Sequence, residues 1–169
     1  MTMKNIKEFH LPRYEELPDL DIYMDQVLQL LNKYIDPIVQ TDMTKTMINN
    51  YVKKGVVSPP IKKKYTKEHL AHLIVVSFLK LVYSMDEITL LISFQMHSCD
   101  IGRAYNYFCD ELERCLVSTF YNEPIIHAPS HIDDPFAVYA LQITIQSVVD
   151  KVYLLVSMQS MKERINADK

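Results

Sequence analysis

Apolar side chains recur along this chain at intervals of three and four residues, which is the spacing of amphipathic helices. The first such stripe begins near Leu20 and predicts a helix over Asp21–Ile35, with Asp19 or Asp21 as its cap. Four more helices are predicted at Thr44–Lys54 (capped by Thr44 and ended by Gly55), from Thr66, over Ile88–Met96 after a Ser84/Glu87 capping box, and at Ile101–Tyr121. A sixth runs from about Pro135 to Ile165.

The segment VVSPPIKKKYT interrupts this helical pattern. Pro59 and Pro60 exclude a continuous helix, so the segment predicts a short extended loop or wing. Gly55 and Gly102 are the only glycines, too few for the turns of a β-sandwich or barrel and for a Gly-rich phosphate loop. The expected fold class is therefore all-α.

Charge is unevenly distributed along the 169 residues, whose formal net charge is −3. Between Thr41 and Leu70 there are seven lysines against Asp42 and Glu68, so this stretch carries a balance of +5. The pattern indicates an acidic body with one basic patch.

Three cysteines without a CxxC pair, and an N-terminus without an apolar signal core, favour a reduced, cytoplasmic location. The longest apolar stretch, LAHLIVVSFLKLVY, is interrupted by His72 and Lys80 and is too short to span a bilayer, so no membrane partner is expected.

Three segments, MINNYVKKGVVSPP, KKKYTKEHLAHL and YSMDEITLL, resemble the DNA-binding domain of MerR-type transcription regulators. The residues that match the family's order are Ile48, Tyr51, Gly55, Val56, Val57, Pro59, Pro60, Tyr65, Thr66, Leu70, Leu73, Ser84, Glu87 and Ile88. The resemblance implies a winged helix-turn-helix. Where the family usually has Arg and Tyr in its recognition helix, this chain has Asn49 and Asn50. Over nearly its whole length the chain is also similar to a small bacterial family known only as a domain of unknown function.

Residues of the basic segment are suited to binding double-stranded DNA, because asparagine can pair with an adenine edge and lysines neutralise phosphates. The candidate DNA-binding residues are Thr44, Lys45, Asn49, Asn50, Lys53, Lys54, Lys62, Lys63 and Lys64. The alternative is a solvated lysine-rich loop beside an ordinary polar helix face.

The last predicted helix has an unusually wide apolar stripe, typical of a bundle core or a subunit interface. Its candidate dimerisation residues are Val138, Leu141, Ile145, Val148, Val152 and Leu155. A monomeric bundle, with this helix enclosed by the helices at 21–35 and 101–121, is the alternative.

Together with the resemblance to MerR-type regulators, which implies the first module, these patterns predict a winged helix-turn-helix at residues 10–95 and a helical module for dimerisation and effector binding at residues 96–169. We expect a homodimeric, sequence-specific transcription regulator, with a small-molecule effector as a further possible partner. The rival hypotheses are a protein-interaction module on the same fold and a small-molecule-binding or enzymatic helical domain.

Other signals are weaker. His69 and His72, or His127 and His131 with a cysteine, are candidate metal ligands. The first pair has no evident third ligand nearby and the cysteine spacings fit no metal template, so no metal or other cofactor is expected. Asp110, Glu111 and Glu113 have the character of a solvated helix face. No catalytic motif occurs, and we expect no enzymatic activity.

Overall fold

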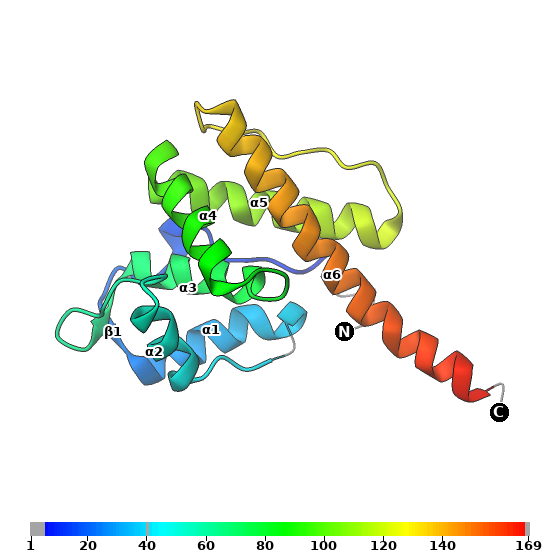
Figure 1. Ribbon diagram of the computed structural model, residues 1–169, viewed down its shortest axis with the longest axis horizontal. Helices are drawn as coiled ribbons and strands as arrows, with labels where there is room; N and C mark the ends of the chain where they lie inside the picture. The colour runs from blue at the N-terminus through cyan, green and yellow to red at the C-terminus, as the bar shows by residue number, and fades with distance from the viewer. Residues whose placement is uncertain (1–5, 40, 168–169) are drawn as a thin grey trace.

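The computed structural model describes residues 6–39 and 41–167, and within these ranges the chain is mainly α-helical, as predicted (Figure 1). Its elements are η2 (Tyr14–Glu16, a 3₁₀-helix), β1 (Ile22–Tyr23), α1 (Met24–Val39), α2 (Lys45–Lys53), β2 (Lys64–Tyr65), α3 (Lys67–Leu79), α4 (Met85–Ser98), α5 (Ile101–Tyr121) and α6 (Pro135–Ala167).

Helix α3 lies at the centre of the molecule, with α1 on one side and α5 and α6 on the other (Figure 1). Nine of its thirteen residues are buried, including the polar residues His69 and Ser77. The ring of Phe78 packs against Phe9 of the N-terminal arm and Phe108 of α5. The two predicted modules therefore share one hydrophobic core around α3.

Several helices begin where local capping chemistry predicts. Thr44 Oγ1 accepts a hydrogen bond from the Met47 amide, and Ser84 forms the predicted capping box with Glu87. Asp100 Oδ1 accepts from the amides of Gly102 and Arg103 at the start of α5.

The first predicted helix needs correction at both ends. Asp19 and Asp21 do not cap it, because Ile22 and Tyr23 are extended and pair with β2 (Ile22 with Tyr65, Tyr23 with Lys64) before α1 begins. At the other end α1 continues through Pro37 to Val39. Proline removes one helical hydrogen bond there, and the burial of the residues that follow it offsets this loss.

Helix α6 packs along α5, which buries most of the stripe predicted as a dimer surface. Ile145, Val148 and Val152 are buried within the single chain, and Val138 and Leu141 are half-buried. Only Leu155 of the predicted set is exposed, at 46%. The predicted face is therefore mainly an intrachain core, because α5 covers it.

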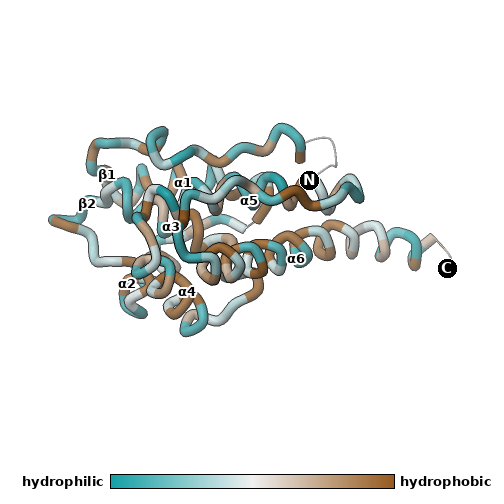
Figure 2. Tube along the Cα trace, turned by 90° about the horizontal axis from the view of Figure 1, so that it is seen from above, coloured by the Kyte–Doolittle hydropathy of each residue, from teal (hydrophilic) through white to brown (hydrophobic). Residues whose placement is uncertain are grey.

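The last turns of α6 run past the rest of the molecule (Figures 1 and 2), and residues 160–167 are all exposed. Within the described residues, no helix combines the length and the apolar character needed to cross a membrane.

The N-terminal arm is held to α5 by Arg13. The guanidinium Nη1 donates to Glu113 Oε1 (2.8 Å) and the Leu11 carbonyl (2.7 Å), while Nη2 donates to Glu113 Oε2 (2.8 Å) and Asp110 Oδ1 (2.7 Å). The hydrogen bond to Glu113 raises the pKa of Arg13, so the guanidinium stays charged. This forked contact closes the arm over the core that Leu11 and Leu17 enter.

We expect Arg13→Met to destabilise the protein by about 2 kcal/mol, since it leaves two half-buried carboxylates without their cation. The matched variant Arg103→Met alters an exposed residue of α5 and is expected to change stability by less than about 0.5 kcal/mol. Urea unfolding followed by circular dichroism measures both changes. Equal stability of the two variants would contradict this role for Arg13.

Candidate nucleic-acid interface

Helix α2 presents one face to the core and the other to solvent. Ile48 and Tyr51 are buried, whereas Asn49, Asn50 and Lys53 are exposed. The loop before α2 is fixed by the Asn32 side chain of α1, whose Oδ1 accepts from the Met43 amide at 2.7 Å and whose Nδ2 donates to the Met43 carbonyl. These contacts help to fix the orientation of the exposed face of α2.

The end of α2 is equally well defined. Gly55 has a φ of +74°, a left-handed conformation that glycine adopts without strain, and its amide donates to the Val52 carbonyl. The next amide, that of Val56, donates to the Tyr51 carbonyl, and Val56 and Val57 are then buried. The predicted stop at Gly55 is confirmed.

A tight two-residue turn follows the prolines. The amide of Ile61 donates to the Lys64 carbonyl (3.0 Å) and the amide of Lys64 donates to the Ile61 carbonyl (2.9 Å). Lys62 and Lys63 form the tip with positive φ values of 51° and 66°, the signature of a type I′ turn. We call residues 61–64 the wing. Such turns favour Asn-Gly, so two lysines at its tip place the backbone in a sparsely populated conformation.

The base of the wing is attached to the body at two points. The antiparallel pairing of β1 with β2 holds one side, and the Lys64 ammonium lies 5.6 Å from the centre of the Tyr23 ring. On the other side the His69 ring contacts both Pro59, before the wing, and Thr66, after it. Its Nδ1 accepts from the Thr66 amide (3.0 Å), which leaves Nε2–H to donate to the Pro59 carbonyl (3.3 Å).

The structure thus gives the predicted DNA-binding residues different surroundings. Thr44 caps α2, Lys45 forms an ion pair with Asp25 (2.7 Å), and Lys64 lies over Tyr23. Another lysine of the basic segment, Lys67, is paired with Asp19. Within the described part of the chain, no side-chain hydrogen bond or ion pair involves the remaining six: Asn49, Asn50, Lys53, Lys54, Lys62 and Lys63.

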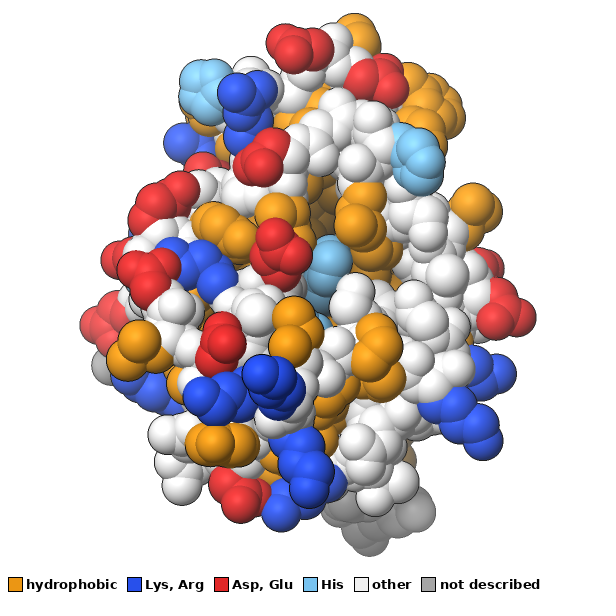
Figure 3. All heavy atoms as spheres, turned by 90° about the vertical axis from the view of Figure 1, so that its left-hand side faces the viewer, with side chains coloured by type: hydrophobic (Ala, Val, Ile, Leu, Met, Phe, Trp, Pro, Cys, Tyr) orange, Lys and Arg blue, Asp and Glu red, His pale blue; other side chains and the backbone are white. Residues whose placement is uncertain are grey.

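The wing and α2 lie at the same end of the molecule in both Figure 1 and Figure 2. Figure 3 views this end directly and shows lysines gathered in its lower half, with carboxylates beside and above them. The basic patch is therefore narrower than the count of seven lysines indicates, because Asp25 and Asp19 neutralise two of them.

The weaker candidates are structural contacts. His69 anchors the wing, and His127 Nδ1 binds Glu111 Oε1. Glu111 is fully buried rather than solvated, because its Oε2 also accepts from the Ala128 amide (2.7 Å) and its Oε1 from the Cys115 thiol (3.5 Å). Among the residues that the structure describes, no group of three or more His, Cys, Asp and Glu is placed to hold a metal ion.

Glu111 therefore holds the 122–134 loop against α5. The sequence does not indicate this role, because Glu111 lies in a run of acidic residues. Burial, reinforced by the neighbouring Glu111, raises the pKa of Cys115 to about 12, so this cysteine is an unreactive thiol at neutral pH. Nothing in the spacing of these residues signals the contact, because the loop that supplies His127 is irregular.

Comparison with known proteins gives one match. The family described as a domain of unknown function (DUF1836) matches residues 12–108, which include α1, α2, the wing, α3 and α4. No MerR-type or other helix-turn-helix family matches. No curated protein and no solved structure matches the chain. Since the matched residues make up more than half of the sequence, the chain belongs to the DUF1836 family of domains of unknown function.

Proposed function

We propose that this protein binds specific sites on double-stranded DNA as a homodimer and regulates transcription. In this proposal α1, α2, the wing and α3 form a winged helix-turn-helix of the MerR-like type, with α2 as the recognition helix. Asn49 and Asn50 on α2 contact the DNA bases. The phosphates are contacted by Lys53, Lys54, Lys62 and Lys63.

One observation carries the proposal: the two lysines at the tip of the wing have left-handed backbone conformations. Each such residue is disfavoured by about 1 to 2 kcal/mol relative to the right-handed conformation. Strain of this kind tends to persist where it serves a site. Lys62 and Lys63 are exposed, and no ion pair or hydrogen bond within the described residues holds their side chains. A solvated loop has no need of lysines there, whereas a phosphate-binding wing does.

The face of α2 supports the same function. Asn49 and Asn50 are adjacent and exposed, and an asparagine amide can form two hydrogen bonds with an adenine edge in the major groove. Lys53 and Lys54 follow at the end of the same short helix. This order places base-reading groups beside phosphate-binding ones, as specific DNA recognition requires.

The direct test is the selection of genomic fragments by the purified protein, followed by affinity measurements on the selected duplex at several salt concentrations. We expect binding that weakens steeply with salt, because each neutralised phosphate releases counterions. Failure to enrich any fragment, with no salt-dependent binding to duplex DNA, would favour the rival protein-interaction module.

The wing itself can be tested by a double variant, Lys62→Asn with Lys63→Gly. It supplies the residues that a type I′ turn prefers, so we expect the free energy of unfolding to rise by about 1 kcal/mol. We expect DNA affinity to fall on all sequences alike, and the slope of log K against log salt to become shallower by about 1.8, or about 0.9 per lost phosphate contact.

The matched control is Lys151→Gln on the exposed surface of α6, which is expected to leave the slope unchanged. Fluorescence anisotropy and urea unfolding give the two readouts. A variant that is more stable yet keeps full affinity and an unchanged slope would refute the role of the wing in DNA binding.

Base readout by α2 can be tested with alanine variants. Asn49→Ala or Asn50→Ala should relax base preference at one or two operator positions, at a cost of about 1 to 3 kcal/mol for each lost paired contact. The melting temperature should hardly change, because both side chains are exposed. Asn166→Ala at the exposed end of α6 is the control. Unaltered sequence preference in both α2 variants, measured by fragment selection, would remove α2 as the reading element.

The surface that we propose for dimerisation differs from the set of α6 residues predicted from the sequence. Past the end of α5, the residues Leu154, Met158, Met161 and Ile165 are 47%, 43%, 50% and 60% exposed. Their spacing of four, three and four is that of a coiled-coil seam. We propose that this seam pairs with its copy about a two-fold axis, as a palindromic DNA site requires.

We expect a dimer at tens of micromolar in sedimentation equilibrium. Leu154→Asp or Met158→Asp should give a folded monomer with weaker operator binding, because a charge in the seam is costly to bury. The control Ile126→Asp changes an apolar side chain of the 122–134 loop that is even more exposed, at 71%, and should remain dimeric. Val152→Asp is instead expected to lower thermal stability, since Val152 lies in the monomer core. A monomeric wild type over the whole concentration range would rule the seam out.

A further inference from the structure

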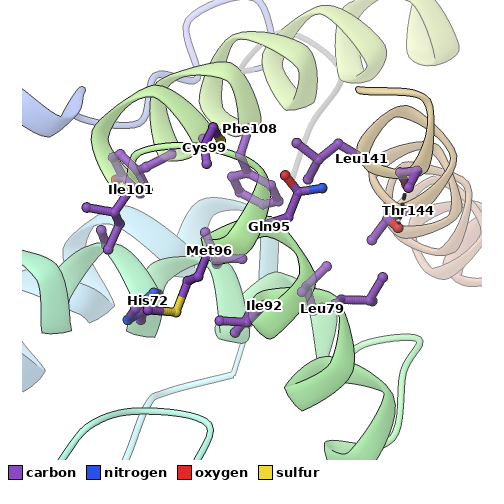
Figure 4. A pocket seen from close by; sticks show the side chains of 16 residues that line it. His72, Leu79, Ile92, Gln95, Met96, Cys99, Ile101, Phe108, Leu141 and Thr144 are labelled. Atoms are coloured by element: carbon purple, nitrogen blue, oxygen red, sulfur yellow. Dashed lines mark hydrogen bonds between the residues drawn. The ribbon is translucent and has the colours of Figure 1, made fainter. Parts of the chain in front are cut away.

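A pocket lies between α3, α4, α5 and α6 (Figure 4). Its free volume is about 70 Å³, so a ring-sized ligand fits only if one wall of the pocket moves. Figure 4 shows His72 and Met96 at one end of the pocket and Leu141 and Thr144 at the other, with Gln95 and Phe108 between them.

The pocket selects against charged molecules. None of the described residues that line it is Asp, Glu, Lys or Arg. The imidazole of His72 is kept neutral because burial lowers its pKa, against a smaller opposing effect of Glu68. A bound charge would therefore lose its hydration without gaining a partner.

Gln95 gives the pocket a specific polar point. Its Nε2 donates to the Ala137 carbonyl of α6 at 3.1 Å, which fixes the orientation of the amide. The other amide atom, Oε1, is then buried with no hydrogen-bond partner among the described residues. Figure 4 shows this oxygen on the side of the amide that faces Phe108, within the pocket. A buried acceptor without a donor is costly, so the position favours a ligand that donates.

One other lining group is compatible with such a ligand. Thr144 donates its hydroxyl hydrogen to the Ala140 carbonyl (2.7 Å), which leaves its oxygen free to accept. The pocket thus combines an apolar body with two acceptors, Gln95 Oε1 and the Thr144 oxygen.

A hollow beside the pocket carries the opposite charge to the wing. It shares His72, Met96 and Cys99 with the pocket and adds the carboxylates Glu68 and Asp100. Figure 3 shows a histidine at the bottom of a hollow on this face, with acidic side chains close by. These carboxylates repel an anion on its way in.

Access is helped by the loose attachment of α4, which forms one wall. Of its fourteen residues only Ile88 is buried, and Met96 on its pocket side is 59% exposed. A helix with so little buried surface can shift to admit a ligand at small cost.

We propose that this pocket binds an uncharged, mainly apolar small molecule of one ring, admitted by a shift of α4, that donates a hydrogen bond to Gln95 Oε1. The inference rests on the pocket alone and does not depend on DNA binding.

Three probes of similar shape test it by calorimetric titration of the full chain: 4-tert-butylphenol, tert-butylbenzene and 4-tert-butylbenzoate. We expect the phenol to bind at least tenfold more tightly than either of the others, since only it is both neutral and able to donate. No binding of the phenol at its solubility limit, or tighter binding of the benzoate, would overturn the proposal.

Variants then locate the site. Gln95→Leu should weaken phenol binding about three- to tenfold and leave tert-butylbenzene binding unchanged or tighter, because it removes only the acceptor. Gln29→Leu makes the same replacement on the exposed face of α1 and should have no effect. Ala140→Leu, which adds bulk inside the pocket, should weaken both ligands and serves if Gln95→Leu fails to fold. Phenol binding that is indifferent to both pocket variants would place the site elsewhere and refute the inference.

Discussion

The all-round burial of α3 is the constraint on which the rest of the structure depends. A helix with nine buried residues in thirteen cannot rest on one neighbour, so it must be enclosed. The N-terminal arm, α1, α5 and α6 enclose it, and aromatic contacts join Phe78 to both the arm and α5. Ser77 is tolerated inside because its hydroxyl donates to the Leu73 carbonyl one turn earlier. The segment that immediately precedes α3, with the wing, is therefore attached to the most rigid part of the core.

The sequence predicts those features that depend on neighbouring residues. The starts of α2 and α4 follow from Thr44 and Ser84, whose side chains accept from amides three positions later. Features set by distant partners are not predictable in this way. Ile22 and Tyr23 fit an amphipathic helix equally well, and only the pairing with Tyr65 and Lys64 makes them a strand. Glu111 belongs to an acidic run, and only the fold of a later loop supplies its buried donors.

The apolar stripe of α6 shows a different limit of periodicity. Val148 and Leu155 are seven residues apart and share a helix face, yet one is fully buried and the other is 46% exposed. The difference arises because α5 ends at Tyr121 and the chain turns back through the 122–134 loop, so α6 outruns its neighbour. A hydrophobic pattern identifies which residues need cover but cannot tell whether the same chain provides it. Of the candidate site, the sequence located α2 and the wing, but not which of their lysines are held by Asp19, Asp25 and Tyr23.

The proposed DNA contact and the proposed pocket meet on one turn of α3. His69 holds the wing through the Pro59 carbonyl, and His72, three residues further on, lines the pocket. Both residues lie in the same rigid helix, so a displacement of this turn moves the base of the wing with it. A ligand can act on the wing only if it binds more tightly to one position of that turn than to another. A ligand that shifts α4 alone, and leaves His72 in place, does not change the position of the wing. The effect of a ligand on the wing thus depends on which helix moves when the ligand binds, the loosely packed α4 or the enclosed α3.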